Sequence, residues 1–308
     1  MLKKEDNKSV FVTYSDLMAL KKKGGIGSVD LNKKNRSVSS GEQKSFLKTK
    51  GMNFEEVREY QQGDDARQID WRITAKQGRP FTKVFVDDTI QHVYILTDLR
   101  QGMRFASAGD FKSVVASKLM AQIAWATLAR KNALHPVFLL PNMVKTYETI
   151  STEGNLSGLF KEVESFSLTE EKTDTTVLQQ GLDHIKKEVH AGSIVIVLSD
   201  FSDAGEAVQK ELSKLAQKHT LLLVHIYDPM ERDLPSGILG FSDGAQTQII
   251  DTRLARMRDA FRAEFDSKER DLKEFSKRYN ISYLALKTID DYVLSLIHFL
   301  ETEGKKYG

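Results

Sequence analysis

The sequence predicts an α/β protein, a doubly wound and mostly parallel sheet with a small N-terminal β-rich subdomain. Short apolar, β-branched runs alternate with stretches of helical periodicity, which is typical of a parallel sheet covered by helices. The run at 194–198 is apolar without interruption, as expected of a strand that is buried on both faces. At 308 residues, with 40% hydrophobic and 29% charged residues, the chain is long enough for one large or two modest domains.

The elements of the α/β domain, expected over 91–308, can be placed in chain order. Strands are predicted at 93–97, 136–140, 194–198, 221–227 and 281–286. Helices are predicted at 111–130, 178–189, 204–218, 253–279 and at the C-terminus, and a looser region with Gly154 and Gly158 precedes the second of them. The apolar runs at 238–241 and 248–250 flank Asp243 and Gly244, which indicates a hairpin on or near the sheet. In the helix at 253–279, the apolar residues Leu254, Met257, Phe261, Phe265, Leu272 and Phe275 are expected to face inward.

Residues 1–90 are expected to form the separate β-rich subdomain. A short helix is predicted near 14–23, followed by a polar connection and strands. Ile69, Trp71 and Ile73 alternate with polar residues, which predicts a strand that buries Trp71, and a second strand is predicted at 81–86.

Charge is distributed unevenly along the chain. The net charge is +2, but residues 1–50 carry 12 basic and 5 acidic side chains. The basic residues Lys21, Lys22, Lys23, Lys33, Lys34 and Arg36 could contact an anionic membrane, although solvated loops are the simpler interpretation. No motif that reads DNA or RNA accompanies them, so no nucleic-acid partner is expected. With no cysteine, no apolar stretch near 18 residues and no apolar signal segment at the N-terminus, a cytoplasmic location is expected.

Aspartates follow three of the predicted parallel strands. Asp98, Asp200 and Asp228 each end an apolar run, and ligands of open α/β sheets collect at the carboxyl ends of strands. Asp98 and Asp200 are the natural pair to line a crevice there and to hold a hard cation such as Mg²⁺. The alternative is that these aspartates cap the helices that follow.

A second cluster of charges lies between residues 58 and 72. Four carboxylates and three guanidiniums fall within fifteen residues, which favours a mutually paired structural network over a metal or acid–base site. The seven histidines show no HxH, HxxxH or HExxH spacing, and neither a GxSxG elbow nor a Walker phosphate loop is present.

This charged segment resembles the signature of the bacterial domain-of-unknown-function family 58. The similarity rests on the runs at 51–60, 63–67 and 69–72, and it extends in weaker form over about residues 10 to 300. Its signature residues here are Arg58, Glu59, Tyr60, Gly63, Asp64, Asp65, Arg67, Asp70, Trp71 and Arg72. The resemblance implies a von Willebrand factor A-like domain, and a role as adaptor or co-chaperone of a MoxR-type AAA+ ATPase and its client proteins.

The resemblance also implies a place for a metal-ion-dependent adhesion site. Asp98, Thr176 and Asp200 match the pattern of metal ligands in von Willebrand factor A-type domains. At two further positions, where those domains have hydroxyl ligands, this chain has Arg100 and Gly102. A guanidinium repels a divalent cation, so we expect Arg100 to occupy the degenerate site and to pair with Asp98 or Asp200. No cofactor is therefore expected, and any Mg²⁺ would have to rest on Asp98, Thr176 and Asp200.

The sequence thus predicts a non-catalytic protein-interaction module rather than an enzyme. Two alternatives stay open. One is a metal-dependent hydrolase or phosphodiesterase at the crevice of Asp98, Asp200 and Asp228, and the other is a peripheral membrane scaffold that uses the basic N-terminal residues.

Overall fold

The chain forms two compact units. The computed structural model describes residues 10–23, 52–61, 64, 66–87, 90–168, 174–242 and 247–306. One unit combines residues 1–40 with 91–308, and the other comprises residues 41–90.

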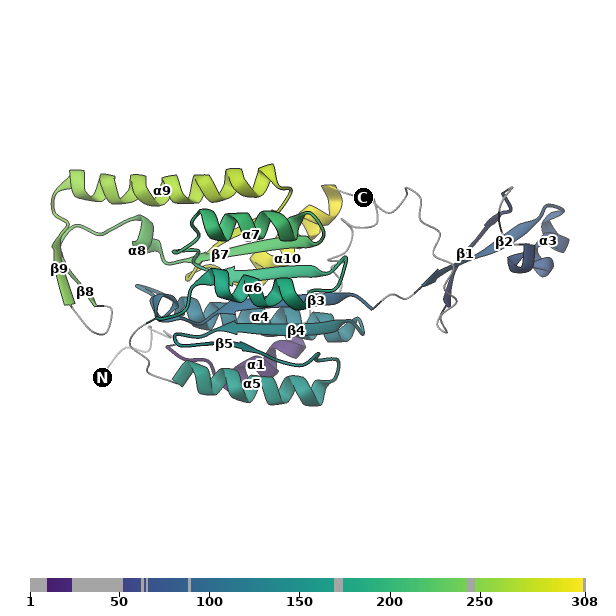
Figure 1. Ribbon diagram of the computed structural model, residues 1–308, viewed down its shortest axis with the longest axis horizontal. Coiled ribbons are helices and arrows are strands. Elements are labelled where there is room, and N and C mark those ends of the chain that lie inside the picture. Colours follow the sequence, from purple (N-terminus) through teal and green to yellow (C-terminus); the bar gives the residue numbers. More distant parts are fainter. Residues whose placement is uncertain are drawn as a thin grey trace. The chain divides into compact units, whose positions relative to one another are not determined.

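The large unit is built on a six-stranded sheet. Its strands lie in the order β10 (Ser282–Lys287), β7 (Thr220–Tyr227), β6 (Ile194–Ser199), β3 (His92–Asp98), β4 (Ala133–Leu139) and β5 (Val144–Thr146). All neighbours pair in parallel except β5, which runs antiparallel to β4 (Figure 1). The continuously apolar runs therefore became buried parallel strands, and the predicted α/β class with a mostly parallel sheet is confirmed.

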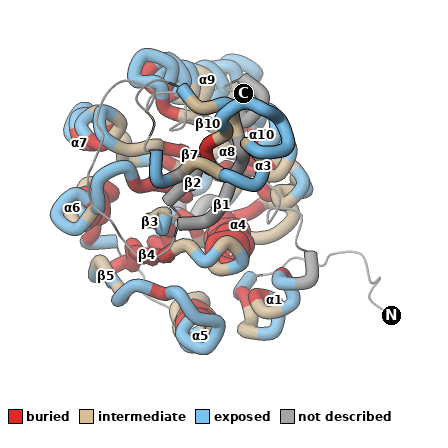
Figure 2. The backbone as a smooth tube through the Cα atoms, turned by 90° about the vertical axis from the view of Figure 1, so that its right-hand side faces the viewer, coloured by how far each residue is buried: buried red, intermediate tan, exposed pale blue. Residues whose placement is uncertain are grey.

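Helices cover both faces of this sheet and bury one hydrophobic cluster on each side. One cluster includes residues of α1 (Tyr14–Ala19), α4 (Lys112–Ala129), α5 (Glu153–Leu168) and α10 (Tyr292–Lys306). The other includes residues of α6 (Leu178–Glu188), α7 (Glu206–Ala216) and α9 (Ala255–Arg278). Figure 2 shows buried residues along the strands and α4, with exposed residues on the outward faces of the other helices. Helix α5 occupies the region around Gly154 and Gly158 that the sequence indicated as loose, because Leu156, Leu159, Phe160 and Val163 supply a buried stripe.

The first helix belongs to the large unit, which corrects the predicted boundary of the N-terminal subdomain. A capping box between Thr13 and Asp16 starts α1, and η1 (Leu20–Lys23) continues it. Leu17 is fully buried, and its carbonyl accepts a hydrogen bond of 3.1 Å from the indole of Trp125 in α4. The residues around this helix therefore help to form the large core, and the small unit is an insertion that follows it.

The small unit pairs two antiparallel strands, β1 (Met52–Glu59) and β2 (Phe81–Asp87). Between them lie η3 (Ala66–Gln68) and a helix, α3 (Trp71–Gln77), where the sequence predicted a strand. Asp70 starts the helix by accepting hydrogen bonds from two backbone amides, and Gly78, with a φ of 70°, ends it. The expected burial of Trp71 is wrong, because this side chain is 69% exposed.

Near the C-terminal part of the large unit, β8 (Ile238–Ser242) and β9 (Thr247–Asp251) form the predicted hairpin. The hairpin is a two-stranded sheet of its own rather than part of the central sheet, and Asp243 and Gly244 lie outside the described residues. A single-turn helix, α8 (Pro229–Arg232), precedes it. In α9 the inward face predicted from sequence holds only for the C-terminal half, since Leu254 and Met257 are 50% and 45% exposed.

Candidate functional site

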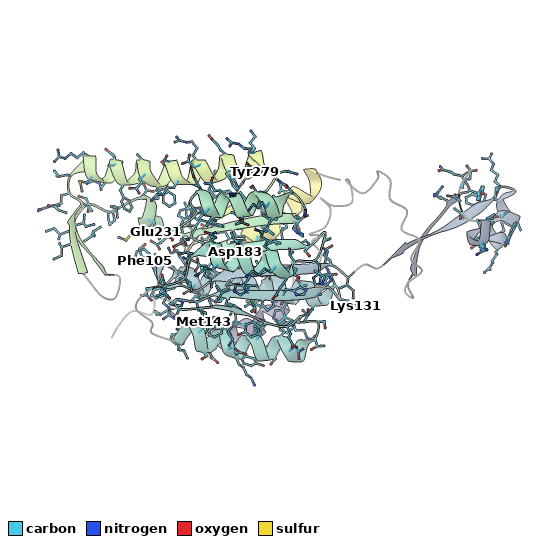
Figure 3. All side chains as sticks on the ribbon, viewed as in Figure 1. Phe105, Lys131, Met143, Asp183, Glu231 and Tyr279 are labelled. Carbon is cyan, nitrogen blue, oxygen red and sulfur yellow. The ribbon has the colours of Figure 1, made fainter. Side chains whose placement is uncertain are left out.

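The parallel strands end in a charged crevice on one edge of the central sheet. The chain passes from β3 to β4 on one side and later returns to β6 on the other, so strand order reverses between β3 and β6. Asp98 is the last residue of β3 and Asp200 follows β6, which brings both to this point as predicted. Figure 3 shows Glu231 on this edge and Lys131, which follows α4, on the opposite edge.

Arg100 fills the crevice beside Asp98. Its Nε lies 3.0 Å from Oδ1 of Asp98, and its Nη2 lies 2.8 Å from Oδ2. The other side of the guanidinium binds Asp203, with Nη1 at 2.8 Å from Oδ2 and Nη2 at 3.0 Å from Oδ1. Burial opposes the charge of Arg100, but the hydrogen bonds to Asp98 and Asp203 outweigh it and raise the pKa of the guanidinium. Arg100 therefore stays charged and holds two carboxylates together.

Lys112 occupies the adjacent part of the crevice. Its ammonium donates to Asp200 at 2.8 Å and to Glu231 of α8 at 2.5 Å, although only 1% of the side chain is exposed. Burial alone would lower the pKa of Lys112, but the carboxylates of Asp200 and Glu231 raise it. Each of the two buried cations therefore binds two of the four carboxylates.

Of the two partners that the sequence offered for Arg100, the structure shows Asp98, and the cation that binds Asp200 is Lys112. Sequence reasoning missed Asp203, Lys112 and Glu231. Lys112 is the first residue of α4 and lies 88 residues before Asp200, so no local spacing in the sequence indicates the contact. The signal in the sequence is that Lys112 is a charged residue in a helix whose buried residues are mostly apolar or small.

The remaining residues of the predicted adhesion site have other partners. The hydroxyl of Thr176 donates to the Leu140 carbonyl at 2.6 Å, and the Thr176 carbonyl accepts from Arg100 at 3.3 Å. Gly102 does face the crevice, since a Cβ there would lie 3.6 Å from Oδ2 of Asp200. A serine at this position could reach Asp200, and glycine supplies no oxygen.

The oxygens of Asp98 are fully used. Oδ1 accepts from the backbone and side chain of Arg100, and Oδ2 accepts from Arg100 and from the Ser199 hydroxyl at 2.7 Å. A Mg²⁺ ion needs free oxygen ligands in near-octahedral geometry, and the crevice offers a guanidinium in that place. The arrangement fits a closed salt-bridge network and does not fit a divalent-cation site.

The Asp228 carboxylate binds hydroxyls and backbone amides rather than Arg100 or Lys112, and its own backbone amide donates to Glu231 at 2.8 Å. It is the N-cap of α8, and it accepts hydrogen bonds from the backbone of Met230 and from the hydroxyls of Ser107 and Thr288. Of the two interpretations that the sequence left open, helix capping holds for Asp228. The crevice is therefore formed around Asp98 and Asp200 alone of the three strand-end aspartates.

Among its described residues, the charged segment of the small unit shows part of the paired network that its composition predicted. Arg58 binds Asp64 at 2.8 Å, and Asp64 also accepts from the backbone of Gln61. Glu59 forms an ion pair of 2.9 Å with Arg79, which lies outside the segment. The Tyr60 hydroxyl donates a hydrogen bond to the Asp64 carbonyl. Asp70 is used as a helix cap, Arg67 and Arg72 are exposed, and Gly63 and Asp65 lie outside the described residues.

Of the basic N-terminal residues, only Lys21 has a described side chain. It forms an ion pair of 2.6 Å with Glu153 and lies 5.2 Å from the centre of the Trp125 ring. Lys22 and Lys23 belong to η1, but their side chains are not described, and Lys33, Lys34 and Arg36 lie outside the described residues. Among the described helices, none is long and apolar enough to cross a membrane.

Comparison with known proteins shows the family of the chain. Residues 56–274 match the family model described as "Protein of unknown function DUF58". The chain belongs to this family. Uncharacterized proteins of Mycobacterium bovis and of two strains of Mycobacterium tuberculosis are 19% identical to this DUF58 protein over 272 residues, which cover 87% of this chain and 84% of each relative.

A solved structure is also similar to this DUF58 protein. It is described as an aerotolerance-related membrane protein from Bacteroides fragilis with multiple mutations to serines. The alignment covers 70% of this chain and 99% of that chain, with 12% identity and a TM-score of 0.41.

Proposed function

We propose that this DUF58 protein is a non-catalytic protein-interaction module, and that it serves as an adaptor or co-chaperone of a MoxR-type AAA+ ATPase. In this proposal the large unit is a von Willebrand factor A-like domain whose adhesion site has lost its metal. The observation that carries the proposal is the pair of buried cations, Arg100 and Lys112, that neutralise the carboxylates of the strand-end crevice.

The chemistry of the crevice argues against turnover there. A metal-dependent hydrolase needs carboxylate oxygens that are free to hold the ion. Asp98 and Asp203 share one guanidinium, and Asp200 and Glu231 share one ammonium. Opening the network would leave charges buried and unpaired, which is strongly unfavourable. This supports a binding role rather than the hydrolase alternative.

Exposed apolar side chains supply surface for partners. Trp71 in the small unit is 69% exposed, and aromatic residues of this kind often carry much of the binding energy at interfaces. On the large unit, Ile249 of β9 and Leu254 before α9 are 75% and 50% exposed. The identity of the partner as an AAA+ ATPase rests on the family resemblance alone.

Affinity capture from the native cell tests this function. The full chain is used as bait in ATP, in ADP and without nucleotide, next to a Trp71→Ala bait. We expect a MoxR-type ATPase to be enriched by the wild-type chain, with an amount that depends on the nucleotide. If no AAA+ ATPase is enriched under any of the three conditions, the adaptor proposal fails. Equal capture by Trp71→Ala would show only that Trp71 is not the contact.

A further inference from the structure

We propose that His92, His135 and His190 form a binding site for a divalent transition-metal ion, with Zn²⁺ as the expected metal. Each imidazole offers one ligand nitrogen, and these atoms all lie within 4.8 Å of one another. The cluster lies where the parallel strands begin, at the edge where Figure 3 shows Lys131. It is therefore at the opposite end of the sheet from the closed crevice, and it does not depend on the proposed function.

The sheet register brings two of the histidines together. His92 begins β3 and His135 is the third residue of β4, and the parallel pairing places Tyr94 directly opposite His135. His92 and Tyr94 are two residues apart and share one face of the sheet, so His135 lies on that same face. As a result Nδ1 of His92 and Nε2 of His135 form a hydrogen bond of 2.8 Å, whose proton would leave when an ion binds both nitrogens.

The third histidine comes from the turn between α6 and β6, and hydrogen bonds hold that turn in place. The His190 carbonyl accepts from the amide and the hydroxyl of Ser193, at 3.2 and 2.6 Å. The Gln91 side chain, next to His92, donates to the Gly192 carbonyl at 2.8 Å. The backbone around His190 is thus fixed to the start of β3 before any ion binds.

Tyr94 selects the tautomer of His190 that a metal needs. The Tyr94 hydroxyl donates its proton to the Glu188 carbonyl at 2.9 Å, and the same oxygen lies 2.7 Å from Nδ1 of His190. Since the hydroxyl proton is already used, Nδ1 of His190 must be the donor in the second bond. Nε2 of His190 then keeps its lone pair free for an ion, as in metal sites whose histidines are oriented by a hydrogen bond from the other ring nitrogen.

The donor set decides the class of metal. The cluster contains imidazoles and no carboxylate, and the chain has no cysteine, so Mg²⁺, Ca²⁺ and thiophilic Cu⁺ are poor matches. Imidazole nitrogen suits Zn²⁺, and three such ligands leave a fourth, tetrahedral position for water.

Binding requires a small rearrangement. The rings of His92 and His190 are stacked, with centroids 3.9 Å apart and planes 9° apart, so their lone pairs lie in nearly parallel planes. One ring must turn to direct both nitrogens at one ion. His92 is the ring that turns, because an ion would replace its hydrogen bond to His135, whereas His190 is held by the Tyr94 hydroxyl and His135 is only 9% exposed and packed on the Tyr94 ring.

Zinc binding by the full chain, prepared without a polyhistidine tag, tests the site. We expect calorimetry to show one Zn²⁺ ion per chain, and X-ray absorption at the zinc edge to show imidazole ligands. His190→Gln is expected to weaken binding at least about tenfold. His184→Gln is the matched control, because His184 lies on α6 outside the cluster, and it should bind like the wild type. Since His190 is exposed, the variant should keep the melting temperature of the metal-free protein, while losing the stabilisation by Zn²⁺.

Two results would overturn the site. Absence of Zn²⁺ binding by the wild-type chain would show that the three rings only pack against one another. An equal loss of affinity in His190→Gln and His184→Gln would show that zinc binds to scattered surface histidines instead. Neither result bears on the capture experiment, so failure of this site is distinguishable from failure of the proposed function.

Discussion

At the scale of single residues, the same local motif occurs twice in different surroundings. Arg100 and Arg253 each follow an aspartate by two residues, and each binds that aspartate through its backbone amide, its Nε and its Nη2. Asp98 and Arg100 are buried, whereas the side chains of Asp251 and Arg253 are 46% and 64% exposed. Because the local geometry is shared, a comparison of the two pairs shows the combined effect of burial and of the additional bonds between Arg100 and Asp203.

We expect Arg100→Ala to lower the free energy of unfolding by about 3–5 kcal/mol, because it leaves Asp98 buried without its cation. Arg253→Ala is expected to change stability little, since water solvates Asp251 in the variant. Denaturant unfolding of both variants measures the difference. Mg²⁺ should restore part of the stability of Arg100→Ala and leave the wild type unchanged, and a wild type stabilised by Mg²⁺ would contradict the closed crevice.

How much of this site the sequence predicts depends on the separation of the residues. The contact of Arg100 with Asp98 follows from two neighbours at the end of one strand, so it was predictable. The contact of Lys112 with Asp200 joins the start of α4 to the end of β6, and the three histidines join β3, β4 and a turn. Only the strand order and the register bring such residues together, and neither can be read from local spacing.

At the scale of elements, buried strands are easier to predict than short exposed ones. The apolar runs of β3, β6 and β7 have one interpretation, whereas the alternation of Ile69, Trp71 and Ile73 fits a strand or the first turn of a helix. The cap formed by Asp70 decides for the helix α3, with hydrogen bonds to the amides of Arg72 and Ile73 at 3.0 and 3.2 Å. Trp71 consequently faces solvent.

We expect Trp71→Ala to change stability by less than about 0.5 kcal/mol, as is usual for exposed positions. Asp70→Ala should cost about 1 kcal/mol, because the first amides of α3 lose their acceptor. Circular dichroism during chemical denaturation gives both values. A loss of several kcal/mol in Trp71→Ala would mean that the tryptophan is buried after all.

At the scale of the whole molecule, stability should depend on pH through a buried histidine. His225 of β7 is 7% exposed, and its Nδ1 lies 2.7 Å from the Tyr283 hydroxyl of β10. Burial lowers the pKa of His225 to about 4, while Asp200 and Glu269 oppose the shift and Lys112 and Lys273 add to it. The unfolded chain takes up a proton near the ordinary pKa of about 6.5 and the folded chain does not.

The free energy of unfolding is therefore expected to fall as the pH falls from about 6.5 towards about 4. His225→Gln should make this fall shallower, because the glutamine does not titrate and can still bond to Tyr283. His298→Gln, at an exposed position of α10, serves as the control and should keep the wild-type slope. Melting temperatures of the three proteins across this pH range measure the effect, and identical slopes for the wild type and His225→Gln would refute it.

The packing of α1 against α4 and α5 also fixes how the small unit is attached. The chain leaves the large unit after α1 and returns to it at β3, so residues 41–90 are joined to one body through two peptide connections. A protease that cuts either connection once leaves every atom of the small unit covalently linked to the rest. Release of that unit requires two cuts. A mechanical force on the small unit is transmitted at the same time to the connection that follows α1 and to the connection that leads into β3.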